Sequence, residues 1–422
     1  MTSNAAGPSL PAVQAALRRT TEHFANELAR PSQARPDWSD FEWCMARAVA
    51  AMHGISPLLA TTLRWQGPAE WQTFLDEQRQ HTERRQQRIQ ALLRLIDDNT
   101  RVAGIPAIAL KGAALHSLGL FRAGERPMAD VDLLVREQDF ERTSRLLEGL
   151  GYHETHSSWR HRSFTPADAT LRTNLGEHAD NYLKIELHER ICEPLPVKIT
   201  TLSHFLADGS PAPGLNPYPS NAALMAHLLL HAAGSMVKRS LRLINLHDIA
   251  LLARRMPEDE WVTLAQWWAL PPLLLTAHYY AGAIPTSALQ AIARHCPRHL
   301  RWSAARVQLT DVSLSRLWVE AFPGIGWARS AGEAARYMAD RIRPGSAAMS
   351  QRKALAASEP GHAGSTWAHL NQGARILRWL TSRPPRPASM YAVRASLDLH
   401  AWATPDYSDS RSCRSESTPS AG

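Results

Sequence analysis

Asp130 and Asp132 are the residues whose types and spacing most directly indicate chemistry in this sequence. One residue separates them, and the apolar run Leu133-Leu134-Val135 that follows is typical of a buried strand. Alternate residues of a strand project from the same face, with Cα atoms about 6.6 Å apart. Both carboxylates can therefore bind one or two hard divalent cations such as Mg²⁺, which prefer oxygen ligands. Alone, an Asp-x-Asp pair is weak evidence, because loops contain many.

Glu186 is the candidate for a third acidic ligand. Residues 182–188 alternate in polarity and predict a strand that places Lys184, Glu186 and His188 on one face. A carboxylate there can bind a second cation or accept the proton of an attacking hydroxyl. His188 can orient that carboxylate, contact a phosphate or carry a proton; the alternative is a hydrogen-bonded structural histidine.

Lys111, Gly112 and Arg126 are candidates for binding phosphate. Gly112 has no Cβ and lets backbone N–H groups approach an anion closely, and the helix expected after it begins with its positive dipole end. Lys111 and Arg126 offer positive charge, Arg126 in a planar bidentate form. The three residues lie upstream of the aspartate pair, so the order is strand, glycine, helix and acidic strand. An ordinary α/β sheet with carboxylates at its strand ends is the alternative.

These residues need a sheet to position them. The sequence predicts strands over 106–110, 130–135 and 182–188, with helices over 113–118 and 138–150 between them, which is an α/β pattern. Residues 159–164 are a weaker strand candidate. Helical spacing precedes this core over 12–30, 41–65 and 71–101, and follows it over 221–234, 241–255 and onward to about 343. A further helix is expected over 365–380, and a disordered tail over 408–422.

The helix expected over 71–101 is rich in arginine. Acidic and polar residues are interleaved with its arginines, so a solvated face is the first interpretation and contact with a nucleotide or another anion is the second. The arginines are Arg79, Arg84, Arg85, Arg88 and Arg94.

Composition sets the broad class of the protein. The chain has 422 residues, 44% of them hydrophobic, and a net charge of +8, which favours anionic partners without singling out nucleic acid. Its four cysteines form no C-x-x-C pair, so neither a zinc ribbon nor a disulfide framework is expected, and reduced thiols in the cytoplasm fit best. The first residues show no signal-peptide pattern.

Residues 261–293 contain no Asp, Glu, Lys or Arg. Because Pro271 and Pro272 interrupt this segment, we expect two buried helices joined at the prolines and no membrane span.

The ordered motifs resemble an uncharacterised bacterial nucleotidyltransferase family within the DNA-polymerase-β-type nucleotidyltransferase superfamily. The resemblance rests on Leu110-Lys111-Gly112, the stretch from Arg126 to Val135, Leu150-Gly151-Tyr152 and Glu186-Leu187-His188, and continues more loosely through His227, His231, Arg242 and Leu246-His247-Asp248. Two departures from the superfamily pattern stand out. Ala113 follows Gly112 where glycine or serine is common, and Glu186 replaces a third aspartate.

The resemblance implies an α+β fold, with a small mixed β-sheet nucleotidyltransferase core and helices, flanked by N- and C-terminal α-helical regions. The expected boundaries are a helical region over 1–100, the core over 101–200, a helical domain over 201–345 and a partly disordered extension over 346–422. Among the helical residues, His227 and His231 are expected to line a cleft or satisfy core hydrogen bonds. Arg242 is expected either to pair with Asp248 or to face the nucleotide.

The implied function is transfer of an NMP group from an NTP to an unidentified hydroxyl or phosphate acceptor with Mg²⁺ or Mn²⁺. In this scheme Asp130, Asp132 and Glu186 are the catalytic metal ligands, and Lys111, Gly112, Arg126 and His188 bind the nucleotide. The expected partners are a nucleoside triphosphate and a small-molecule, peptide, protein or glycan acceptor, with nucleic acid less favoured. The alternatives are a non-catalytic nucleotide- or RNA-binding protein of the same fold and a phosphotransferase using the same site.

Overall fold

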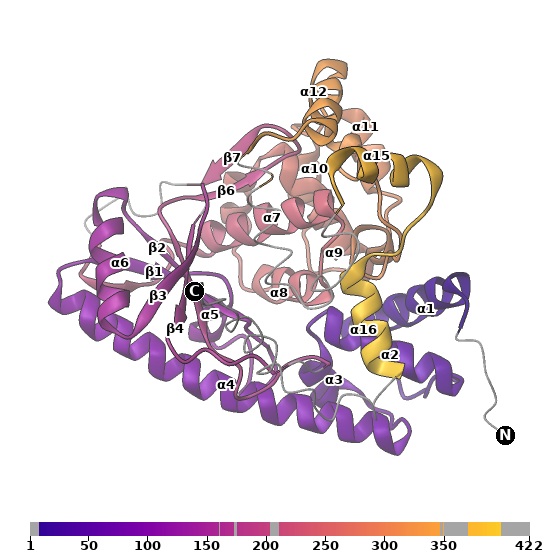
Figure 1. Ribbon diagram of the computed structural model, residues 1–422, viewed down its shortest axis with the longest axis horizontal. Coiled ribbons are helices and arrows are strands. Elements are labelled where there is room, and N and C mark those ends of the chain that lie inside the picture. Colours follow the sequence, from indigo (N-terminus) through magenta and orange to yellow (C-terminus); the bar gives the residue numbers. More distant parts are fainter. Residues whose placement is uncertain are drawn as a thin grey trace, which may run out of the picture.

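A mixed sheet with helices on both sides forms the body of the molecule (Figure 1). The computed structural model describes residues 8–159, 161–172, 175–202, 211–346, 349 and 370–397. The α+β class predicted from the sequence is confirmed. The disordered tail expected over 408–422 lies outside the described residues, as do residues 350–369.

Six strands form the main sheet, in the order β3-β4-β5-β2-β1-β8. The central strands β2 and β5 run parallel, β1 is antiparallel to β2 and parallel to β8, and β3, β4 and β5 pair antiparallel. The bounds are β1 Pro106–Ala109, β2 Asp130–Val135, β3 Tyr152–Ser157, β4 Arg162–Pro166, β5 Lys184–His188 and β8 Gly214–Asn216. A separate hairpin pairs β6 (Ile191–Pro194) with β7 (Ile199–Leu202).

The weaker strand candidate over 159–164 overlaps β4, and the three strands predicted most clearly, β1, β2 and β5, are neighbours in the sheet. Their apolar side chains are fully buried, as at Val131 and Ile185, so hydrophobicity marks them in the sequence. The two edge strands, β3 and β8, were not predicted. Polar, largely exposed residues make up β3, and β8 has three residues within a proline-rich stretch. Neither carries the apolar signal on which strand prediction depends.

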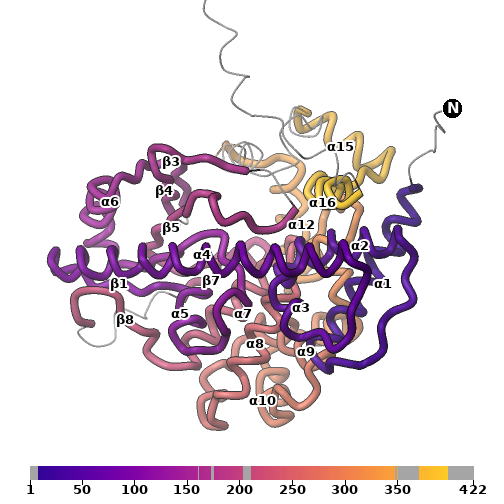
Figure 2. The backbone as a smooth tube through the Cα atoms, turned by 90° about the horizontal axis from the view of Figure 1, so that it is seen from below, coloured from indigo at the N-terminus to yellow at the C-terminus, as the bar shows by residue number. Residues whose placement is uncertain are grey.

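Four helices precede the sheet, namely α1 (Leu10–Ala29), α2 (Asp40–Met52), α3 (Ser56–Thr62) and α4 (Ala69–Val102). The helix predicted over 41–65 is two helices, because Gly54 adopts a positive φ of 64° between them. Helix α4 was predicted almost to the residue. It runs the length of the molecule, from α3 to the far side of the sheet (Figure 2), and packs on β1 and β8.

Two short helices lie within the sheet connections, α5 (Gly112–Ser117) and α6 (Phe140–Gly149). The helices after the sheet are α7 (Asn221–Lys238), α8 (Leu243–Ala253), α9 (Leu270–Tyr279), α10 (Thr286–Ala293), α11 (Arg298–Ala304), α12 (Ala331–Ile342), α15 (Gln372–Thr381) and α16 (Pro387–Leu397). The last of these returns to pack on α2 (Figure 1).

One detail of the segment 261–293 differs from expectation. Pro271 and Pro272 do not join two helices; they form the first turn of α9, where their missing N–H groups cost no hydrogen bond. The residues before them form short 3-10 turns, and the break between helices falls at 280–285 instead. Among the described residues, no helix is both long and apolar enough to cross a membrane.

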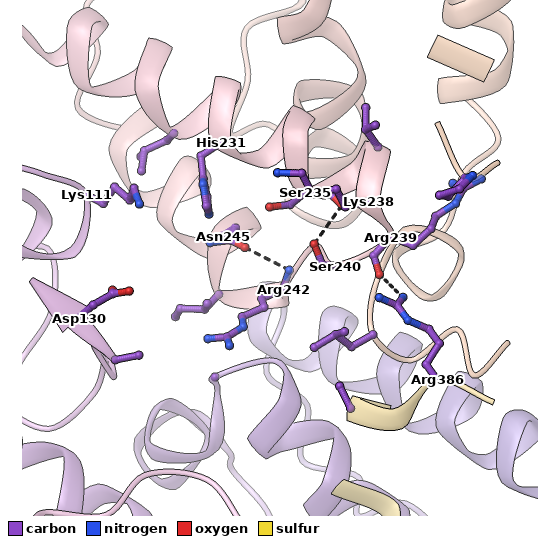
Figure 3. Close-up of a pocket in the computed structure, with 18 of the residues that line it drawn as sticks. Lys111, Asp130, His231, Ser235, Lys238, Arg239, Ser240, Arg242, Asn245 and Arg386 are labelled. Carbon is purple, nitrogen blue, oxygen red and sulfur yellow. Dashed lines mark hydrogen bonds between the residues drawn. The ribbon is translucent and has the colours of Figure 1, made fainter. Parts of the chain in front are cut away.

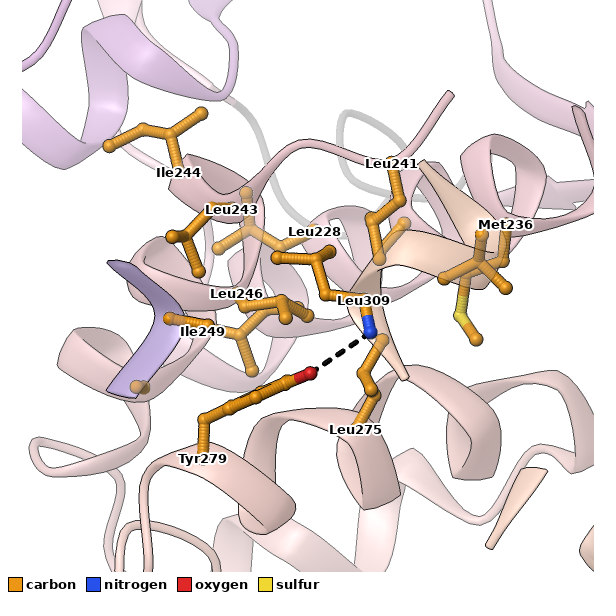
Figure 4. Packing of buried hydrophobic residues seen from close by; sticks show 14 of the residues in the cluster. Leu228, Met236, Leu241, Leu243, Ile244, Leu246, Ile249, Leu275, Tyr279 and Leu309 are labelled. Atoms are coloured by element: carbon orange, nitrogen blue, oxygen red, sulfur yellow. Dashed lines mark hydrogen bonds between the residues drawn. The ribbon is translucent and has the colours of Figure 1, made fainter. Parts of the chain in front are cut away.

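Two hydrophobic clusters hold these layers together. One lies between the sheet, α4 and α6; the other joins α1–α3 to α7–α9 and reaches α16. Figure 4 shows part of the second, where the Tyr279 hydroxyl accepts a hydrogen bond from the backbone N–H of Leu309 at 3.0 Å among packed leucines. The domain boundaries near residues 100, 200 and 345 remain a prediction.

Candidate active site

The pairing of β2 with β5 brings the three predicted acids together. In the parallel register Asp132 lies opposite Glu186, and Asp130 lies opposite Lys184. Val131, Leu133 and Val135 of β2 and Ile185 and Leu187 of β5 are buried in the cluster beneath α4 and α6, so the acids project from the opposite face. The alternation seen in the sequence therefore has the consequence expected of it.

Two basic side chains contact Asp132. The Lys111 ammonium lies 3.0 Å from Oδ1 of Asp132, and His188 Nε2 lies 3.1 Å from the same oxygen. Burial alone acts to raise the pKa of Asp132, but Lys111 and then His188 outweigh it and hold the pKa well below its usual range. Lys111 and His188, both predicted from the sequence, are thus in contact with the central carboxylate.

Lys184 occupies the space between the other two acids. Its Nζ lies 2.5 Å from Oε1 of Glu186 and 3.5 Å from Oδ2 of Asp130. Burial, followed by repulsion from Asp132 and Glu186, raises the pKa of Asp130 to about 6. Repulsion among the three carboxylates thus adds to the effect of burial, and a bound cation would offset that repulsion. The sequence placed Lys184 on this face but did not indicate its role.

A second donor group surrounds Glu186. Ligand atoms of His161, Glu186 and His188 all lie within 4.8 Å of one another. His161 Nε2 is 3.7 Å from Glu186 Oε1, and His188 Nε2 is 3.8 Å from Oε2 of the same carboxylate. His161 was not predicted, because it lies just before β4, in a stretch whose pattern indicates a strand only weakly.

Arg126 forms a buried bidentate ion pair with Asp248 of α8. Its Nε and Nη2 donate to the two carboxylate oxygens at 2.8 and 2.7 Å, and Nη1 donates to the carbonyl of Pro127 at 3.3 Å. Asp248 is therefore not the partner of Arg242, one of the two arrangements expected from the sequence. The Arg242 guanidinium has no ion-pair partner among the described residues.

Gly112 makes room for this arginine. A Cβ at Gly112 would lie 2.4 Å from Nη1 of Arg126 and 2.9 Å from Cγ of Met128. Lys111, the residue before it, has a φ of 47° that side-chain-bearing residues rarely adopt. Packing against Arg126 and Met128 thus favours glycine at 112 independently of any phosphate, whose binding there remains a prediction.

Tyr218 contacts the backbone of Lys111. Its hydroxyl accepts from the Lys111 N–H at 3.4 Å and lies 2.7 Å from Nδ1 of His227. Burial lowers the pKa of His227 well below its usual range, so this histidine is neutral and structural. His231, one helical turn further along α7, lines the cavity described below. Both outcomes agree with the expectation for these two histidines.

Arg85 of α4 holds the chain just before Asp130. Its side chain is 4% exposed, and its Nη2 donates to the carbonyls of Met128 and Ala129 at 3.2 Å each. Its Nη1 donates to the backbone carbonyl of Asn181 at 2.8 Å. The prediction of a solvated arginine face is wrong at Arg85, whereas the other four arginines of the predicted face are exposed as expected, including Arg88, which donates to the Asn181 carbonyl at 3.0 Å. Charge interleaving in a sequence does not reveal which arginines reach backbone carbonyls of a distant segment.

A cavity of about 870 Å³ opens in front of this face. Lys111 and Asp130 lie at one end of it, Arg242 and His231 in the middle, and Arg239 and Arg386 at the other end (Figure 3). Gly112, Arg126 and Asp132 also belong to its wall. Glu186 does not, and His188 lines a small adjoining pocket with Lys111 instead.

Comparison with known proteins identifies the class to which this fold and acidic face belong. Residues 39–282 match the sequence model of a family described as uncharacterised nucleotidyltransferase, and the chain belongs to that family. The match runs from α2 to the turn after α9 and includes every predicted site residue. No curated protein and no solved structure matches the chain. The family supports nucleotidyl transfer as the general activity and a nucleotide as substrate.

Proposed function

We propose that this protein transfers an NMP group from a nucleoside triphosphate to a hydroxyl or phosphate acceptor, using Mg²⁺ or Mn²⁺. The observation that carries the proposal is the set of three carboxylates on one face of β2 and β5, beside a cavity that also contains Lys111. Cavities of roughly 300–1,000 Å³ are the usual size of small-molecule sites.

The donor set fits a divalent cation. Asp130, Asp132 and Glu186 would hold it, and such an ion would offset the repulsion among them that, after burial, raises the pKa of Asp130. A bound cation would supply charge stabilisation to the phosphoryl group during in-line displacement. His161 and His188 beside Glu186 add imidazole nitrogens, which suit transition metals better than Mg²⁺. We therefore expect Mn²⁺ to act at lower concentrations than Mg²⁺.

Basic residues of the cavity would bind the triphosphate. Lys111 is held by Asp132 in this structure, and a cation on that carboxylate would leave the ammonium group to phosphate oxygens. Arg242, which lines the cavity without an ion-pair partner among the described residues, is a second phosphate ligand in this scheme. Arg126 keeps two N–H protons beyond those that bind Asp248 and Pro127, so its direct contribution is also proposed.

The transfer itself needs an acceptor oxygen in line with the α-phosphorus. A bond forms from that oxygen to phosphorus, the bond to the bridging oxygen breaks, and pyrophosphate leaves; a base takes the proton of a hydroxyl acceptor. Because Glu186 lies outside the cavity wall and is bound to Lys184, we assign it to holding the cation rather than to contacting the acceptor.

Product analysis tests the reaction type. The protein is incubated with Mg²⁺ and ATP labelled at the α- or the γ-phosphate, with water and simple polyols as trial acceptors. Release of pyrophosphate, abolished in Asp132→Asn and retained in Asp98→Asn on the exposed face of α4, supports nucleotidyl transfer. ADP as the product would assign phosphoryl transfer instead. Salt-dependent RNA binding without turnover would favour the binding-protein alternative.

A further inference from the structure

The end of the cavity remote from the carboxylates has a wall of different origin. Part of it comes from residues after the segment that matches the family, which ends at residue 282, and Arg239 adds a side chain from within that segment. Trp318 and Glu320 come from the loop before α12, Tyr337 and Arg341 from α12, and Arg386 from the start of α16. The acidic face thus lies within the matched segment, whereas most of the remote wall lies outside it.

The cavity as a whole is positively charged. Seven cationic side chains and four carboxylates line it: Lys111, Arg126, Lys238, Arg239, Arg242, Arg341 and Arg386 against Asp130, Asp132, Asp248 and Glu320. At the remote end Glu320 is the only carboxylate of the described wall, and it is neutralised by Arg239 at 3.2 Å and by Arg316. Lys238 pairs with Glu193 at 3.0 Å and Arg386 donates to the Ser313 carbonyl at 3.3 Å, whereas Arg341 has no carboxylate partner among the described residues.

Arg341 is the clearest case. Its Nε donates to the carbonyl of Ala321 at 3.0 Å and its guanidinium lies 5.4 Å from the ring centre of Trp379, which fixes the plane of the group. Its two terminal nitrogens make no hydrogen bond, and it pairs with no carboxylate, among the described residues. Burial lowers the pKa of Arg341, so the site disfavours the charge it contains. Partly buried charges of this kind are normally paired.

We propose that this remote end is the acceptor subsite, and that it binds the acceptor through an oxyanion, a phosphate or a carboxylate, placed on Arg341. Arg341 offers a planar, pre-oriented fork of N–H donors, which matches either anion. The proposal rests on the proposed function, which places the triphosphate at the other end beside Lys111. A cavity of about 870 Å³ has room for both ligands. Trp318 and Tyr337 provide apolar surface for the body of the acceptor.

The test uses the full chain with its donor end filled. The protein is saturated with Mg²⁺ and the α,β-methylene analogue of ATP, and inorganic phosphate or acetate is then titrated by calorimetry. We expect binding of at least one anion in the presence of the analogue, weakened by about tenfold or more in Arg341→Gln. Arg336→Gln, on the exposed side of the same helix, is the matched control and should bind as the wild type does. Phosphate against acetate distinguishes the two kinds of anion.

Several results would overturn the proposal. Competition between phosphate and the analogue would place the anion at the donor end, and equal binding by Arg341→Gln and wild type would remove Arg341 from the site. Thermal melting of the variants controls for folding. If Arg341→Gln unfolds, Tyr337→Phe and Trp318→Ala are used in its place. Their readout is the Kd for phenyl phosphate, a phosphorylated aromatic probe. Unchanged binding in both would also reject the subsite. Because phosphate can be titrated without the analogue, loss of ATP binding alone would reject the proposed function and leave Arg341 testable.

Discussion

At the scale of single residues, Gly112 shows how one position can satisfy two requirements. The sequence suggests a glycine that admits phosphate, and the structure shows a glycine whose missing Cβ leaves space for Arg126 and Met128. Only the second is a packing constraint that acts without a ligand. The two can be separated because overpacking changes stability, whereas a lost phosphate contact changes only nucleotide affinity.

Gly112→Ala should therefore destabilise the fold by about 1–3 kcal/mol, since the new methyl group displaces the Arg126 guanidinium. Urea unfolding measures this effect, and nucleotide titration measures the accompanying loss of affinity. Gly149→Ala is the control, because a Cβ at that exposed helical position meets nothing within 4 Å. It should leave the protein unchanged or slightly more stable. A stable Gly112→Ala variant that binds no nucleotide would favour the phosphate role alone.

Which site residues the sequence reveals depends on how local their signal is. Two strands whose residues alternate in polarity carry Asp130 and Asp132, and Glu186 and His188. Because alternate residues of a strand share a face, the sequence alone predicts which face each pair occupies. The pairing of Arg126 with Asp248 spans 122 residues along the chain and leaves no local pattern. The same is true of His161, which approaches Glu186 only because β4 pairs with β5.

At the scale of elements, α4 is the support for the acidic strand. Arg85 reaches from this helix to the carbonyls of Met128 and Ala129, immediately before β2 begins. Arg85→Gln should lower stability by about 1–3 kcal/mol through unsatisfied carbonyl groups, and weaken nucleotide binding although Arg85 touches no ligand. Arg84→Gln, exposed on the same helix, should do neither. Chemical denaturation and calorimetry check both effects; unchanged nucleotide affinity in a folded Arg85→Gln protein would contradict the positioning role.

The Arg126–Asp248 pair joins the segment before β2 to α8. Breaking it by Asp248→Ala leaves a buried guanidinium without its partner, which should cost about 3–5 kcal/mol. Replacing both residues by Arg126→Met and Asp248→Leu should recover much of that loss, because no charge is then buried. Denaturant unfolding of the two variants measures the difference. A double variant as unstable as Asp248→Ala would show that the unpaired buried charge is not the cause of the lost stability.

At the scale of the whole molecule, neutral buried histidines couple the fold to pH. His53 accepts from the Leu243 N–H at 2.9 Å and lies 2.9 Å from the Ser315 hydroxyl, joining three distant segments. Burial, followed by repulsion from Arg242, lowers the pKa of His53 from 6.5 to about 3. The unfolded chain therefore binds a proton that the folded chain does not, and stability is full above pH 6.5 and lost progressively as pH falls toward 3.

This histidine should account for about 2 kcal/mol of the stability lost on going from neutral pH to about pH 5. His53→Gln should be less stable at neutral pH but show a shallower decline, since glutamine does not titrate. His299→Gln, at an exposed position, should follow the wild-type profile. Unfolding free energies measured across this range decide the point. An unchanged slope in His53→Gln would assign the acid sensitivity to other groups.

The overall architecture was predictable where burial is strong. Apolar periodicity in the sequence predicts the central strands and the long helices. The length of its helical pattern predicts α4. Three features could not be predicted: the edge strands, the helical turn formed by Pro271 and Pro272, and the remote cavity wall. They depend on contacts between segments that are far apart in the chain. Arg341 in particular lies in no recognisable motif, and only its position in the cavity wall indicates a binding role.

The central claim is that the three carboxylates form a metal-dependent nucleotide site. Calorimetric titration of ATP with and without Mg²⁺, on wild type and on Asp130→Asn and Asp132→Asn, tests it most directly. We predict affinity that requires the metal in the wild type and is lost in both variants, with Asp98→Asn unaffected. Nucleotide binding that is the same with and without metal, or the same in the variants as in the wild type, would contradict the account.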